Sequence, residues 1–226
     1  MSGIFNQQNI QAQFELEQEW FQQNPAATTI SSEGTSTTLT ATGTASVVND
    51  TTGEYIDYLS ATNPANSIMG VIGGFTDYSG NDNPVYSASM KTGTSITSIR
   101  LWCGLTNSNV FTLNVFPNAG IGAAFKYVPA VDGTAFWRTS TSTGAAITTT
   151  TTTTAIAADT RYNLRIDWRS PTFIIFSING VPVATHTTNL PALTQSLALM
   201  CGGSMTSNGN ARSIRFRRMS ATRGLR

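Results

Sequence analysis

The chain has 226 residues, of which 40% are hydrophobic and 11% charged, and its formal net charge is +1. The length allows one large domain with a real core. A charged fraction well below the usual level of about 25%, offset by Thr, Ser, Asn and Gly, favours an all-β protein with polar, uncharged surfaces. No apolar run reaches transmembrane length and no signal peptide is evident, so we expect synthesis in the cytoplasm.

Residues 1–25 are predicted to form an amphipathic helical arm. Ile10, Phe14 and Phe21 fall near one helical face, with Trp20 beside it, and Pro25 ends the pattern. A helix this short needs a surface on which to bury its aromatics. We expect it to dock on another subunit, with packing on its own domain as the alternative. The Thr- and Ser-rich residues 26–46 fit a flexible linker or an edge strand equally well.

Residues 47–226 show many short strands separated by turn signals. Strands are predicted at Ile96–Leu105, Val110–Phe116, Ala123–Val128, Ala135–Thr139, Ile147–Ile156, Leu197–Cys201 and Ile214–Met219. The fifth of these contains seven consecutive threonines, and we predict a strand there because threonine favours strands and a glycine turn precedes the run. The even spacing indicates a sandwich or jelly roll.

Arg161–Thr187 is predicted to form two consecutive hairpins. Its first strand alternates apolar residues, from Tyr162 to Trp168, with polar ones. After a turn at Ser170-Pro171 comes a more continuously apolar strand, and Asn179-Gly180 is a strong signal for a two-residue hairpin turn.

The order of these segments resembles a known family. GAAFKY (122–127), FWRTST (136–141), TRYNLRIDW (160–168), FSINGVPVATHTTNLP (176–191) and SIRFRRMSATR (213–223) are similar to the concanavalin A-like (laminin-G-like) jelly-roll domain, in the version common in bacteriophage virion proteins. The resemblance covers about residues 95–223. It implies an antiparallel sandwich, but this fold hosts lectins, glycanases, adhesive modules and virion parts.

Catalytic chemistry is not evident. The acid cluster that enzymes of this superfamily carry on one strand is missing, and Asp132, Asp159 and Asp167 are isolated in sequence. Asp167 is expected to form a surface ion pair with its neighbouring arginines. His186 is expected to be an exposed strand residue without a catalytic partner. We therefore predict no enzyme activity, no cofactor and no metal.

Three further features leave alternatives. Asp77–Asn83 could be a calcium loop, but an Asx-rich turn without metal is the better interpretation. Cys103 and Cys201 alternate with apolar residues and are expected to be buried free thiols rather than a disulfide. Trp102 and Trp137 are the candidates for contact with a glycan or a neighbour, and Trp168 is expected in the core.

The charges are divided between the two halves of the chain. Residues 1–90 hold nine acids and no Lys or Arg, whereas residues 91–226 hold three acids and thirteen bases. Six of those bases form a basic C-terminal tail: Arg212, Arg215, Arg217, Arg218, Arg223 and Arg226. Because no aromatic-studded basic groove accompanies the tail, we favour charge complementarity between the two halves of one fold, or between neighbouring copies of it, over specific nucleic-acid binding.

These observations together predict a non-enzymatic bacteriophage virion protein, most simply a capsid decoration (cement) protein. Its partners would be the major capsid protein and copies of itself, expected as a homotrimer. The predicted contact residues are those of the arm and the tail: Ile10, Phe14, Trp20, Phe21, Arg215, Arg217, Arg223 and Arg226. The alternative is a tail fibre or spike module that binds host-surface glycan.

Overall fold

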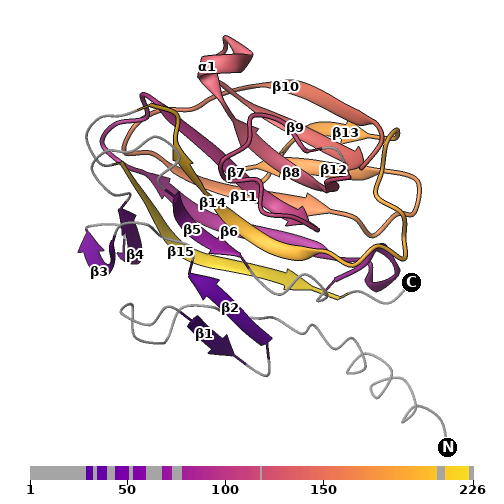
Figure 1. The fold of residues 1–226 in the computed structure, drawn as a ribbon, viewed down its shortest axis with the longest axis horizontal. Coiled ribbons are helices and arrows are strands. Elements are labelled where there is room, and N and C mark those ends of the chain that lie inside the picture. Colours follow the sequence, from indigo (N-terminus) through magenta and orange to yellow (C-terminus); the bar gives the residue numbers. More distant parts are fainter. Residues whose placement is uncertain are drawn as a thin grey trace, which may run out of the picture.

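The computed structural model describes residues 29–32, 35–39, 44–50, 53–59, 68–72, 78–117, 119–207 and 212–223. These residues form two antiparallel sheets packed face to face, so the all-β sandwich predicted from the sequence is confirmed (Figure 1). The predicted helical arm lies outside the described residues. No described helix is long and apolar enough to cross a membrane.

The first sheet, sheet A, has eight strands in the order β1-β2-β5-β14-β7-β8-β9-β10. In that order their bounds are Thr29–Ser32, Thr35–Leu39, Ile68–Ile72, Ala198–Met205, Ile99–Thr106, Ile121–Tyr127, Phe136–Thr143 and Ile147–Ala155. Strands β1 and β2 and the beginning of β3 therefore lie within the Thr- and Ser-rich segment 26–46.

The second sheet, sheet B, has seven strands in the order β13-β12-β11-β6-β15-β4-β3. In that order their bounds are Val181–His186, Ile174–Ile178, Arg161–Asp167, Val85–Thr92, Ser213–Thr222, Gly53–Leu59 and Thr44–Asp50. Two single-turn helices complete the described elements, η1 (Gly80–Asp82) and α1 (Pro129–Asp132).

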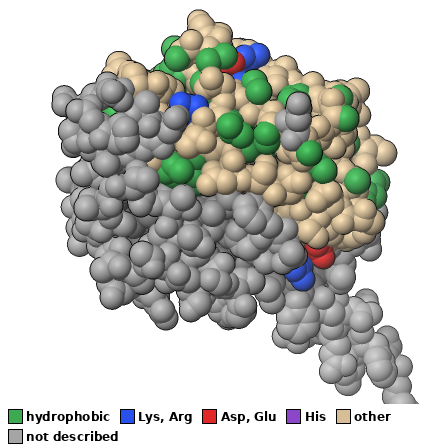
Figure 2. Space-filling model, in the orientation of Figure 1, with side chains coloured by type: hydrophobic (Ala, Val, Ile, Leu, Met, Phe, Trp, Pro, Cys, Tyr) green, Lys and Arg blue, Asp and Glu red, His purple; other side chains and the backbone are tan. Residues whose placement is uncertain are grey.

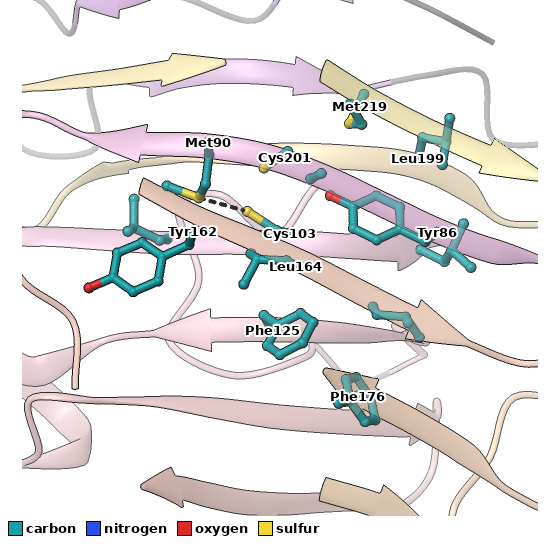
Figure 3. Close-up of a cluster of buried hydrophobic side chains, with 14 of the residues drawn as sticks. Tyr86, Met90, Cys103, Phe125, Tyr162, Leu164, Phe176, Leu199, Cys201 and Met219 are labelled. Atoms are coloured by element: carbon teal, nitrogen blue, oxygen red, sulfur yellow. Dashed lines mark hydrogen bonds between the residues drawn. The ribbon is translucent and has the colours of Figure 1, made fainter. Parts of the chain in front are cut away.

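The main core lies between the two sheets. Side chains that alternate along β7, β8 and β14 meet those of β6, β11 and β12, and the aromatic rings of Phe125 and Phe176 pack edge to face across the two sheets at 5.3 Å. Figure 3 shows part of this cluster, with rings and aliphatic side chains from both sheets interleaved. Burial of this apolar surface is the main force that holds the two sheets together.

The two predicted hairpins are confirmed. Strand β11 pairs with β12 and β12 pairs with β13, and along β11 buried and exposed side chains alternate as its sequence indicates. Asn179 and Gly180 have φ of 52° and 82°, the left-handed values that a two-residue hairpin of this kind requires at both positions.

One predicted strand is not found: residues 110–116 form turns and irregular chain. The strand predicted at Ile214–Met219 is confirmed as β15 (Ser213–Thr222), between β6 and β4 inside sheet B, so most of the arginine-rich stretch that we described as a basic tail belongs to the sandwich. It becomes a strand because Ile214 and Phe216 alternate inward and are buried in the core.

Candidate functional site

The centre of the outer face of sheet A, over β7, β8 and β14, is covered by the described residues 107–117 and 119–120 of the segment that connects β7 to β8, which we call the strap. Under it lies a second apolar cluster made of residues from the strap and from β7, β8 and β14: Trp102, Val110, Phe111, Phe116, Ala124, Ala198 and Met200. The rings of Trp102 and Phe116 pack edge to face at 5.2 Å. The centre of this face is therefore a second small core and not an open surface.

The strap is fixed by hydrogen bonds to four consecutive carbonyl oxygens. The donors are four side chains on the outer faces of β7, β8 and β14, each reaching one carbonyl in turn. Ser204 Oγ donates to Phe111 at 2.6 Å, Arg100 to Thr112, Trp102 Nε1 to Leu113 at 2.9 Å, and Lys126 Nζ to Asn114 at 2.8 Å. Backbone carbonyls of a covered segment need such partners, because sheet hydrogen bonds are not available to them.

A buried ion cluster borders the strap. One carboxylate oxygen of Asp132, at the end of α1, lies 3.2 Å from Lys126 Nζ and 2.5 Å from a guanidinium nitrogen of Arg138. The side chains of Lys126 and Asp132 are only 3% and 6% exposed. Burial lowers the pKa of Lys126, and the charge of Asp132 opposes that shift. The carboxylate thus compensates a lysine that would otherwise be costly to bury.

The expected aromatic contact residues are not on the surface. Trp102 lies under the strap, Trp137 faces the main core, and both are fully buried. The expectation that they contact a glycan or a neighbour is therefore wrong. Trp102 does point away from the main core, as its position opposite Leu101 and Cys103 predicts, but the strap covers it. Trp168 is buried in the main core, as predicted.

His186 is buried, so the expectation of an exposed strand histidine is wrong. It faces the gap between the sheets, where its Nε2 and Nδ1 each lie 2.9 Å from a hydroxyl oxygen, of Thr139 and Thr141 on β9. Burial lowers the pKa of His186 to about 4. The imidazole is therefore neutral near pH 7 and ties the edge of sheet B to sheet A.

Every carboxylate between residues 78 and 223 faces a basic side chain. The four pairs are Asp82 with Arg223 (4.0 Å), Asp132 with Lys126 (3.2 Å), Asp159 with Lys91 (3.0 Å), and Asp167 with Arg169 (2.6 Å). The predicted ion pair of Asp167 is thus confirmed, and Arg165 also lies 3.2 Å from it. Partial burial opposes ionisation of Asp167, but hydrogen bonds from its arginines outweigh it and lower its pKa.

The two cysteines lie opposite each other on β7 and β14. Cys103 and Cys201 are register partners, both are buried, and both are free thiols in the structure. The Cys103 thiol lies 3.6 Å from the sulfur of Met90, as the dashed line in Figure 3 marks. Burial raises the pKa of Cys201 well above its usual value. A protonated thiol in an apolar cluster is a poor nucleophile and packs as a small hydrophobe.

The predicted subunit-contact residues are not brought together in one site by the described structure. Ile10, Phe14, Trp20, Phe21 and Arg226 lie outside the described residues.

Two of the predicted contact arginines, Arg215 and Arg223, have neighbours within the sandwich. Arg217 lies in β15, and Arg215 in the same strand is the register partner of Asp57 on β4 and of Lys91 on β6. Arg223, just after β15, has its guanidinium 5.4 Å from the centre of the Tyr78 ring.

In the Asx-rich turn, the side chain of Asp82 accepts hydrogen bonds from the protein itself. One carboxylate oxygen of Asp82 accepts hydrogen bonds from the backbone N–H of Ser79 at 2.7 Å and from its hydroxyl at 2.9 Å, and Asn83 adopts φ 50°. Asp77 lies outside the described residues. Across the described part of the chain, no three His, Cys, Asp or Glu side chains form a group that could hold a metal ion.

The two edge strands on one long side of the sandwich lack acidic and basic residues. The last strand of sheet A, β10, contacts the last strand of sheet B, β13, and neither contains a Lys, Arg, Asp or Glu. Exposed apolar side chains occur at the start of each strand, Ile147 (42%) and Val181 (62%). On the face of the molecule drawn in Figure 2, charged side chains of the described region are likewise few. An uncharged side is a candidate surface for protein contact.

No protein-family model and no curated protein matches the chain. Solved structures match it in fold. A protein of unknown function from Shewanella oneidensis MR-1 is similar with a TM-score of 0.64 and 12% identity, over 100% of this chain and 97% of that one. A glycoside hydrolase family 16 enzyme from Bacteroides ovatus has a TM-score of 0.53 and 9% identity, over 78% and 84%.

The binding domain of Paraclostridial Mosquitocidal Protein 1 is also similar, with a TM-score of 0.56 and 13% identity. The match covers 87% of this chain, which spans 47% of the length of that one. Identities this low show the fold alone. The chain therefore has a concanavalin A-like jelly-roll fold, which is shared by glycan-cleaving enzymes and by the binding domains of Paraclostridial Mosquitocidal Protein 1 and of a botulinum neurotoxin.

Proposed function

We propose that this chain is a non-enzymatic structural protein that acts by contact with other protein subunits, and that it decorates and stabilises the outer surface of a bacteriophage capsid. The observation that carries the non-enzymatic part is the pairing of each carboxylate between residues 78 and 223 with a basic side chain. Hydrolysis of a glycosidic bond ordinarily needs two carboxyl groups that face each other across the bond.

The covered centre of the outer face of sheet A supports the same proposal. Small-molecule and glycan sites are concave and open to solvent, whereas here the strap covers Trp102 and holds Arg100 and Lys126 in hydrogen bonds to its carbonyls. The alternative role, a glycan-binding tail module, relied on Trp102 and Trp137 as contact residues. Both are buried and cannot contact a glycan in this structure.

A capsid-binding assay tests the decoration role. The full chain is mixed with capsids that lack it, and occupancy is measured by co-sedimentation and electron microscopy. We expect saturable binding and a higher temperature of capsid disruption, and we expect deletion of residues 1–24 to abolish binding if the arm makes the contact. Absence of binding by the full chain would contradict the role, and unchanged occupancy after the deletion would contradict the contribution of the arm.

A parallel assay tests the non-enzymatic part. The full chain is incubated with host-surface polysaccharides and applied to a glycan array. We expect neither depolymerisation nor specific binding. Cleavage of a polysaccharide would overturn the proposal, and strong array binding would favour the tail-module role in its place.

A further inference from the structure

The free edge of β10 is the feature that carries this inference. In the strand order of sheet A, β10 pairs with β9 on one side only, and among the described residues no strand pairs with its other side. Its sequence, ITTTTTTTA over Ile147–Ala155, contains no charged residue and no proline. Natural edge strands are usually protected from pairing by lysine, proline or bulges.

The hairpin between β9 and β10 determines which backbone groups face outward. Thr143 N–H donates to the Ala146 carbonyl at 3.1 Å, so these two residues form the hydrogen-bonded pair next to the turn. In an antiparallel ladder hydrogen-bonded pairs alternate with pairs that make no such bond. With the observed register, the N–H and C=O groups of Ile147, Thr149 and Thr151 therefore point away from β9, toward the free edge.

The two edge strands on this side, β10 and β13, differ in how they are protected from pairing with another strand. Pro182 lies in β13, where a proline on an edge strand blocks pairing. Strand β10 is protected only toward its end, where a register shift between Thr151 and Ala155 interrupts the ladder. The regular part, residues 147–151, remains a short, uncharged edge with three backbone donors and three acceptors that no described strand pairs.

We propose that β10 pairs with β10 of a second copy of this chain, antiparallel, across a two-fold axis at Thr149. In this register Thr149 lies opposite its own copy, and Ile147 lies opposite Thr151 at both ends. Because these are the residues with outward backbone groups, the pairing forms six N–H···O=C bonds and joins two copies of sheet A into one continuous sheet.

Self-pairing fits this strand better than pairing with a different chain. A two-fold axis places each residue near its own copy, which is unfavourable for charged strands and neutral for a run of threonines. The exposed Ile147 would gain the methyl group of Thr151 as a neighbour. This pairing specifies one of the subunit contacts in the proposed function, and its biological role rests on that proposed function. It predicts a dimer, in place of the trimer expected from the sequence.

Cysteine cross-linking tests the register. In a hydrogen-bonded antiparallel pair the Cα atoms are about 5.5 Å apart, a separation within the range of about 4.4–6.8 Å found for disulfides. We expect Thr149→Cys to give a disulfide-linked dimer on mild oxidation. The matched control is Thr153→Cys, an exposed position on the same strand that would lie roughly 25 Å from its own copy. The native thiols do not compete because both are buried.

Light scattering on the full chain tests the assembly itself. We expect wild type at high concentration to have twice the mass of one chain. Thr149→Pro removes an outward N–H but no backbone hydrogen bond to β9, and Thr149→Lys places two like charges at the axis, so both should halve the mass. Both variants also lose the hydroxyl contact of Thr149 with Ser140 on β9, at 3.0 Å. Thr94→Lys, on an exposed connection between β6 and β7, should leave it unchanged.

The outcomes separate this inference from the proposed function. A monomeric wild type, or equal cross-linking of the Thr149→Cys and Thr153→Cys variants, would overturn β10 pairing, and capsid binding by that monomer would leave the decoration role intact. A dimer that cross-links through Thr149→Cys but does not bind capsids would support the pairing and contradict the decoration role.

Discussion

Trp102 Nε1 donates a hydrogen bond to the carbonyl oxygen of Leu113 at 2.9 Å. Through this bond a side chain on the outer face of β7 holds the middle of the strap. The same indole packs against Phe116 and lies beneath the ammonium group of Lys126, 5.8 Å from its ring centre. Trp102 lies on the outer face of sheet A, and because the strap covers it, it belongs to a second core.

Replacing this indole tests how much the hydrogen bond contributes. Trp102→Phe keeps a ring under the strap but leaves the Leu113 carbonyl without its donor, so we expect a loss of about 1–3 kcal/mol in the free energy of unfolding beyond the effect of lost volume. Trp168→Phe is the control, because the Trp168 indole nitrogen is buried without a protein partner among the described residues. Urea denaturation of both variants measures the difference, and equal losses would contradict the role of the bond.

A second prediction concerns Asp132 and Lys126. Asp132→Asn leaves a buried ammonium without its counter-charge, so we expect a loss of about 3–5 kcal/mol in stability. Adding Lys126→Met should recover part of that loss, because the apolar stem remains and the charge is gone, while the Asn114 carbonyl loses its donor.

Asp167→Asn provides a contrast with the buried cluster. Its arginine partners are largely exposed, so the expected change is within about 1 kcal/mol. Thermal and urea unfolding of the three variants checks both statements. A double variant as unstable as Asp132→Asn alone would mean that the carboxylate does not act by compensating the lysine.

The local signals in the sequence predicted what local physics determines. The alternation in β11 and the Asn179-Gly180 turn depend on neighbouring residues, and both were predicted correctly. The segment 110–116 was not, because its sequence alternates like a strand while its carbonyls bond to side chains from three different strands. Nothing within that segment indicates these partners.

The errors at the candidate site have the same origin. The sequence places Trp102 correctly on the face opposite the main core, but exposure depends on the strap that covers that face. His186 depends on the threonines of β9, 45 and 47 residues away in sequence. The Lys126–Asp132 cluster had one weak signal, a lysine within the apolar run GAAFKY, which points to a buried charge that needs a partner.

Thiol reactivity gives a third prediction. Cys103 and Cys201 are buried and reduced, and burial raises the pKa of Cys201. We therefore expect an alkylating reagent to modify neither thiol in the native protein and both on unfolding, at a rate limited by opening of the core. Mass spectrometry after timed labelling measures this. Fast modification of the native protein would contradict the packing shown in Figure 3.

The pH dependence of stability gives a fourth prediction, because the chain has a single histidine. The pKa of His186 is lowered to about 4 by burial, whereas an unfolded histidine has a pKa of about 6.5. As the pH falls below about 6.5 the unfolded chain takes up a proton first, which favours unfolding. The contribution of neutral His186 is therefore complete above that pH and is lost progressively as the pH falls toward 4.

The hydrogen bonds of His186 also assign its neutral tautomer. The Thr141 hydroxyl donates to the Thr188 carbonyl at 3.2 Å, so its oxygen accepts from the Nδ1–H of His186, and Nε2 accepts from Thr139. We expect nitrogen chemical shifts in NMR to show the proton on Nδ1.

For the pH dependence, we expect the free energy of unfolding to decline between pH 6.5 and 5 by at most about 1.4 kcal/mol per pH unit. His186→Gln should remove that slope, and parallel pH profiles for wild type and variant would contradict the lowered pKa of His186.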